Sequence, residues 1–95
     1  MKEITLDAIT WSGRDDFYDA LHPALGAPQW HGRNLDALSD TLGGDGINEV
    51  KPPFHIRIIS IASVPPELFS YLKRFAELVN ELQARDGRQI SLTLE

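Results

Sequence analysis

The sequence alternates three short strand-like segments with helical segments, and this order is the strongest constraint on its fold. Residues 3–7 alternate apolar and polar side chains, with Ile4 and Leu6 on one face, as expected of a strand. Residues 54–61 are rich in isoleucine and nearly continuously apolar toward their end, which predicts a strand covered on both faces, and residues 88–94 alternate again. Helical segments between successive strands favour right-handed crossovers. We therefore predict an α/β fold with one three-stranded parallel sheet covered by helices.

Capping residues and prolines mark the ends of the two longer helices. Ser12 is suited to cap the first helix, and Pro23 should end or kink it, because proline lacks the N–H that would bond the carbonyl one turn earlier. The last helix should begin at Pro65 and Pro66 and end at Gly87, which readily adopts the left-handed conformation of a helix end. These residues mark turns within one fold.

The length of the chain limits it to one core. With 95 residues, positions 1–95 are expected to form a single small domain. The chain has no cysteine, which excludes disulfides, thiolate metal sites and cysteine nucleophiles. No apolar run approaches the roughly 18–20 residues of a membrane-spanning helix, and the N-terminus lacks a signal-peptide pattern, so we expect a cytoplasmic protein.

The net charge constrains the partners of the protein. Its 14 Asp and Glu residues outnumber its 9 Lys and Arg residues, which gives a formal net charge of −5. This field repels phosphate backbones and anionic membrane surfaces, so direct binding to nucleic acid or to a membrane is not expected. The same field attracts a basic protein.

The most informative segment is a short helix predicted after residue 33. Asn34 is suited to cap this helix, and Gly43 with Gly44 should stop it after about two turns. Its buried stripe would be formed by Leu35, Leu38 and Leu42. Asp36 and Asp40, four residues apart, then lie side by side on another face.

Helix stability explains only one of these two carboxylates. Asp36 lies in the first turn, where the helix dipole favours a negative charge by about 0.3–1 kcal/mol. Asp40 lies near the other end, where the dipole is unfavourable, and it also repels Asp36. Asp40 therefore indicates a binding function, and a solvated acidic face is the structural alternative.

The same segment resembles the signature of the barstar family, whose members are intracellular inhibitors of the secreted ribonuclease barnase. The matching residues are Asn-Leu-Asp-Ala-Leu at positions 34–38, with Gly32 and Asp40 in register. The remaining helices and strands are compatible with this family, although only residues 30–43 match sharply. The resemblance implies a barstar-like domain over residues 1–95 that is an immunity-type inhibitor and no enzyme.

The resemblance also implies how the chain binds a basic, barnase-like ribonuclease. In the family, a loop and the second helix enter the active site, and acidic side chains occupy the places of RNA phosphates. By position, Asp36 and Asp40 would mimic these phosphates. Gly32 and Asn34 would shape the loop, and Trp30 would pack on the enzyme. A monomer that forms a one-to-one complex with the ribonuclease is expected.

Three positions near the acidic pair depart from the family. His31 stands where barstar has a tyrosine, Arg33 where it has an acid, and Ser39 where it has a tryptophan. The rim of the binding surface therefore differs, and the partner need not be barnase itself.

The late part of the last helix also departs from the family, which uses carboxylates there. Aligned on Gly87, the chain offers Asp86 at one such place and Leu82 at the other, with Glu81 one position away. The predicted partner-binding residues are thus Trp30, His31, Gly32, Asn34, Asp36, Ser39, Asp40, Glu81 and Asp86.

Other uses of the acidic pair are alternatives to this interpretation. A metal site of His31 with Asp36 and Asp40 would be loosely spaced, so no metal or cofactor is expected. A small hydrolase could use the two aspartates as general acid and base, but no Ser-His pair or Gly-rich phosphate loop accompanies them. The remaining alternative is an acidic regulatory module that binds a basic protein other than a nuclease.

Overall fold

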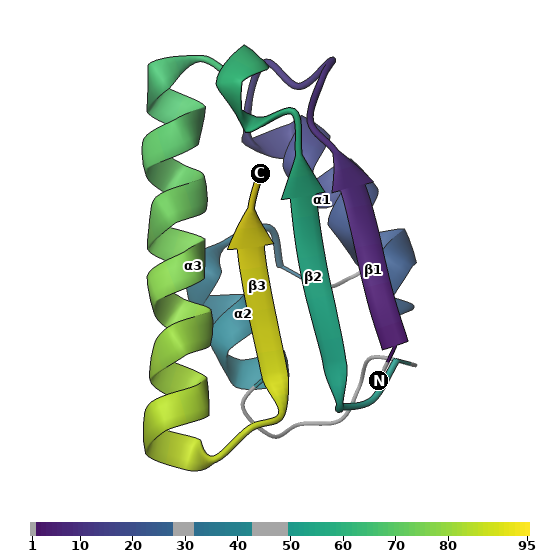
Figure 1. The fold of residues 1–95 in the computed structure, drawn as a ribbon, viewed down its shortest axis with the longest axis vertical. Coiled ribbons are helices and arrows are strands. Elements are labelled where there is room, and N and C mark those ends of the chain that lie inside the picture. Colours follow the sequence, from purple (N-terminus) through teal and green to yellow (C-terminus); the bar gives the residue numbers. More distant parts are fainter. Residues whose placement is uncertain (1, 28–31, 43–49) are drawn as a thin grey trace.

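The computed structural model describes residues 2–27, 32–42 and 50–95, and these residues form one sheet with helices packed against it (Figure 1). In chain order the elements are β1 (Lys2–Asp7), α1 (Arg14–Leu25), α2 (Leu35–Asp40), β2 (Phe54–Ile59), the 3₁₀ helix η2 (Ile61–Ser63), α3 (Pro66–Asp86) and β3 (Ile90–Leu94). The three strands are parallel and lie in the order β1, β2, β3. The predicted α/β fold with a three-stranded parallel sheet is confirmed.

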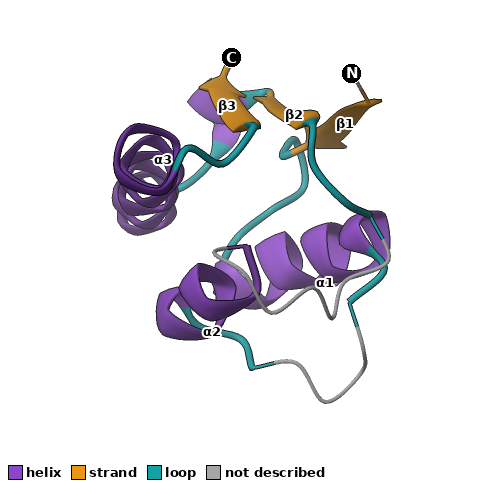
Figure 2. Cartoon of the chain, turned by 90° about the horizontal axis from the view of Figure 1, so that it is seen from below, coloured by secondary structure: helices purple, strands orange, loops and turns teal. Residues whose placement is uncertain are grey.

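The three α-helices lie on one side of the sheet (Figure 2). Each strand is added to the sheet in the same direction, so right-handed crossovers carry every helix to the same side. The register is simple, since Ile4 of β1 pairs with Ile56 of β2, which pairs with Leu92 of β3. One face of the sheet therefore closes the core, and the other face is open to solvent.

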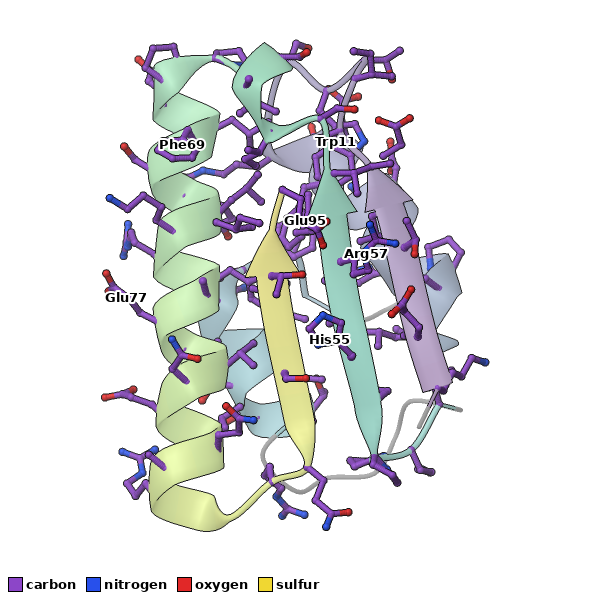
Figure 3. The ribbon with its side chains drawn as sticks, in the orientation of Figure 1. Trp11, His55, Arg57, Phe69, Glu77 and Glu95 are labelled. Atoms are coloured by element: carbon purple, nitrogen blue, oxygen red, sulfur yellow. The ribbon has the colours of Figure 1, made fainter. Side chains whose placement is uncertain are left out.

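The prediction that the second strand is covered on both faces is wrong. Burial alternates along β2, with Phe54, Ile56 and Ile58 buried. His55 and Arg57 are only half-buried and point to the open face, where Figure 3 shows them with Glu95. The reason is topological, because all helices pack on one face and leave none for the other.

The core lies between the inner face of the sheet and the helices. α3 contributes buried side chains at helical spacing, and Phe75 contacts Phe17 of α1 with ring centroids 5.2 Å apart. Inside this core, the hydroxyl oxygens of Tyr18 and Tyr71 are 2.5 Å apart, and burial raises the pKa of Tyr18. The pair joins α1 to α3, so the two long helices are fixed relative to each other.

The first helix begins and ends slightly later than predicted. Gly13, rather than Ser12, occupies the N-cap, and Asp16 accepts hydrogen bonds from the backbone N–H groups of both residues at 3.2 and 2.8 Å. Pro23 lies inside α1, which continues for two more residues. The helix ends at Gly26, whose φ of 67° allows its N–H to bond the Pro23 carbonyl.

The last helix agrees with its predicted ends. Pro65 is the N-cap, Pro66 is the first helical residue, and Gly87 follows the helix with a left-handed φ of 67°. Although α3 has 21 residues, no helix in the described parts of the chain is long and apolar enough to cross a membrane.

Candidate functional site

The site is built on α2, whose start is fixed by a side-chain cap. The Asn34 carboxamide oxygen accepts a hydrogen bond from the backbone N–H of Ala37 at 2.7 Å, which confirms the predicted cap. The N–H of Leu38 bonds the Asn34 carbonyl at 3.2 Å. The predicted stop at Gly43 and Gly44 lies outside the described residues.

The leucines of α2 attach it to the core and leave its carboxylates outside. Leu38 is fully buried, and Leu42, which lies just past the end of α2, is nearly so, as predicted from their spacing. Leu35, the third residue of the predicted stripe, is only partly buried. Asp36 and Asp40 are both exposed, and neither forms an ion pair with another described residue. α2 thus presents to solvent two negative charges that no described side chain pairs.

A hollow of about 430 Å³ lies between α2 and α3. Three of the predicted residues meet there, namely Asp36, Ser39 and Glu81. The remaining lining residues are Leu35, Arg74, Glu77 and Leu78. The structure therefore brings the acidic helix and the late part of α3 into one surface.

The hollow is acidic with apolar walls. Its three carboxylates outnumber the single cation, Arg74, and the side chains of Leu35 and Leu78 supply apolar contact. Figure 3 shows Glu77 projecting from α3. Arg74 and Glu77 were missed by the sequence analysis. They share a stripe of α3 with Glu81, but only the packing of α2 against α3 shows that this stripe faces the site.

Gly32 lies where a side chain would press against the first turn of α2. A Cβ atom at this position would lie 3.1 Å from the Cβ of Ala37 and 3.2 Å from Nδ2 of Asn34. Both contacts are tighter than ordinary van der Waals separations. The absence of a side chain thus lets the chain pass close to the capped first turn.

The other predicted residues cannot be assigned to this surface from the structure. Trp30 and His31 lie outside the described residues. Asp86 ends α3, and its side chain lies outside the described parts. Their contacts with a partner remain predictions.

Arg33 has a structural role that the sequence analysis missed. Its Nη2 atom lies 2.7 Å from Oδ1 of Asp19, and its Nη1 donates to the Asp15 carbonyl at 3.2 Å. The hydrogen bond to Asp19 raises the pKa of Arg33, and the charges of both aspartates add to this effect. The i,i+4 spacing of Asp15 and Asp19 was the available signal, since two such carboxylates on one helix favour a shared cation.

The open face of the sheet carries a separate polar network. His55 lies between Ser91 Oγ, 2.6 Å from Nδ1, and Thr93 Oγ1, 3.1 Å from Nε2. Thr93 donates to Glu95, which also binds Arg57. These groups satisfy one another across β2 and β3. Within residues 2–27, 32–42 and 50–95, no three His, Asp or Glu side chains lie close enough to hold a metal ion.

Comparison with known proteins identifies the family. A search of curated proteins found no match to the chain. The model of the family described as Barstar (barnase inhibitor) matches residues 1–95, the whole chain. The resemblance seen in the short acidic helix therefore extends over the entire domain, and the chain belongs to the barstar family.

Proposed function

We propose that this protein inhibits a basic, barnase-like ribonuclease by inserting α2 into its active site. The observation that carries the proposal is the state of Asp36 and Asp40, which are exposed and unpaired among the described residues while Leu38 fixes their helix to the core. The family is described as barnase inhibitors, which supports a protein partner of this kind.

The two aspartates would replace RNA phosphates among the cations of the active site. Carboxylates accept charge-assisted hydrogen bonds from arginine and lysine in much the same way as phosphate oxygens. Once water is excluded by the complex, these interactions become stronger because the local dielectric constant falls. Asp40 lies at the unfavourable end of the helix dipole, so a bound cation would also relieve the repulsion that α2 imposes on it.

The hollow between α2 and α3 would receive a cationic side chain of the ribonuclease. Asp36, Glu77 and Glu81 supply negative charge, and the two leucines of its walls can contact the methylene groups of an arginine or lysine. The neighbouring loop residues Gly32 and Asn34 would hold the entry to α2 in shape. Trp30, His31 and Asp86 are proposed as further contacts around this surface.

An inhibition assay with barnase as the probe tests this function. Wild-type protein should abolish RNA cleavage at a one-to-one ratio, and Asp40→Asn should weaken inhibition strongly, because removal of one partner from a buried ion pair costs about 3–5 kcal/mol. The control variant Glu67→Gln makes the same charge change at the exposed start of α3. Equal inhibition by Asp40→Asn and wild type would overturn the proposed mechanism.

Binding without inhibition would point to the alternative function. An acidic regulatory module could bind a basic protein through the same surface and leave RNA cleavage unchanged. A pull-down with a basic protein that is not a nuclease, scored with wild type and Asp40→Asn, separates the two functions.

A further inference from the structure

The segment that leads into α2 is attached to α1 by Arg33. The guanidinium contacts the Asp19 carboxylate at 2.7 Å, the Asp15 carbonyl at 3.2 Å and the Asp15 carboxylate at 3.5 Å. Asp15 and Asp19 are neighbours on one face of α1, so the arginine bridges two like charges that would otherwise repel each other. One side chain thus connects the entry of the binding helix to a different element of the fold.

This attachment is important because α2 has only six residues. A helix this short does not hold its own direction in water, so its orientation depends on contacts with the rest of the molecule. Leu38 anchors the middle of α2 in the core. Arg33 lies directly before the Asn34 cap, so its contacts with α1 act at the start of the helix.

Arg33 also pairs with carboxylates of α1 and not with Asp36 or Asp40. It is the only Lys or Arg within residues 32–42, and its described partners all belong to α1. Asp36 and Asp40 therefore remain available for a partner although a cation lies close to them in the sequence.

We propose that Arg33 is a positioning residue for the inhibitor surface, which orients α2 through its bridge to Asp15 and Asp19. This inference rests on the proposed function, because it assigns the bridge a role in presenting Asp36 and Asp40 to a ribonuclease. The role depends on the contacts that Arg33, just before α2, makes with Asp15 and Asp19 of α1.

Binding kinetics with barnase test this role, because the charge change and the loss of positioning in Arg33→Ala should shift the affinity in opposite directions. Arg33→Ala changes the net charge from −5 to −6, which by electrostatics alone favours a basic partner. A positioning role predicts the reverse, a dissociation constant about three- to fivefold higher that comes from faster dissociation. Lys2→Ala, which makes the same charge change on β1, should bind as tightly as wild type or slightly more tightly. Unchanged or tighter binding by Arg33→Ala would overturn the proposal.

Variants of α1 show whether Arg33 acts through its bridge or touches the enzyme directly. Asp19→Ala should weaken binding beyond its charge-matched control Glu67→Ala. The double variant with Arg33→Ala should bind more weakly than Arg33→Ala only by the charge effect that Glu67→Ala shows, because both changes break the same link. If Asp19→Ala behaves as Glu67→Ala does, Arg33 does not act through α1.

A measurement on the free protein separates this proposal from the proposed function. Amide hydrogen exchange within α2 should be faster in both Arg33→Ala and Asp19→Ala than in wild type, while exchange in β2 should stay slow. This result would stand even if wild type failed to inhibit barnase, in which case only the proposed function would fail. Unchanged exchange in α2 in both variants would remove the positioning role.

Discussion

Arg57 binds both carboxylate oxygens of Glu95 and thereby ties the middle strand to the end of β3. The Nε–Oε2 distance is 2.8 Å and the Nη2–Oε1 distance is 3.0 Å, so the two groups form a bidentate pair. Arg57 also lies 3.4 Å from a Glu3 oxygen on β1. A single guanidinium therefore connects all three strands on the face that the helices leave uncovered.

This pair makes the stability of the sheet dependent on acid pH. The hydrogen bonds from Arg57 lower the pKa of Glu95 from 4.5 to about 2. A carboxyl whose pKa is lower in the folded state stabilises the fold above its unfolded pKa and loses this contribution as the pH falls toward the folded value. Thermal melts should therefore show Glu95→Gln less stable than wild type at neutral pH, with the difference shrinking between about pH 4.5 and 2.

Salt provides the control for this prediction. The groups are partly exposed, so added salt should reduce the difference between Glu95→Gln and wild type at neutral pH. A difference that stayed constant from neutral to acid pH would show that Glu95 contributes by packing and not by its charge.

Removal of the Asp40 carboxylate should not destabilise the fold. Asp40→Ala eliminates both the repulsion of Asp36 and an unfavourable dipole interaction, so stability should stay equal or rise by a few tenths of a kcal/mol. Asp36→Ala should lose a little stability, because this residue lies in the favourable first turn. Thermal melts of the two variants distinguish a partner-binding from a structural carboxylate, and a melting temperature several degrees lower for Asp40→Ala would contradict the partner-binding role.

The fold was largely predictable because each element carries a local signal. Alternation marks Ile4 and Leu6, and the ends of α3 follow from Pro66 and Gly87. What the sequence could not give is the side of the sheet on which the helices pack. The isoleucine-rich β2 therefore looked doubly covered, whereas His55 faces solvent and bonds its neighbours on β3.

Features of the site that depend on α2 alone could be predicted from the sequence. Features that depend on how α2 packs against another helix could not. The Asn34 cap and the burial of Leu38 follow from spacing within α2. The hollow adds Arg74 and Glu77 only because α3 packs beside α2. The partners of Arg33 likewise could not be predicted from its own segment, because they lie on α1.

The acidic surface should affect the rate of association more than the rate of dissociation. A net charge of −5 attracts a basic ribonuclease over long range, and salt screens this attraction beyond about 8 Å at physiological ionic strength. Contacts within the formed complex are closer than this and are screened less. Stopped-flow binding to barnase should therefore show association slowing markedly with salt while dissociation changes little, and an association rate indifferent to salt would remove the steering argument.

Gly32 offers the most local test of how the binding segment is shaped. Gly32→Ala places a methyl group 3.1 Å from Ala37 Cβ and 3.2 Å from Asn34 Nδ2, so both neighbours must give by a few tenths of an ångström. Complete loss of an N-cap costs about 1 kcal/mol, and we expect a smaller loss of stability together with weaker ribonuclease inhibition. Gly13→Ala is the control for the inhibition assay, because its new methyl group meets no atom within 4 Å and its φ of −159° is ordinary extended backbone. It is no control for stability, since Gly13 is the N-cap of α1 and alanine is a poorer N-cap than glycine. If Gly32→Ala inhibited the ribonuclease as well as Gly13→Ala does, the close approach at Gly32 would have no role in holding α2 for its partner.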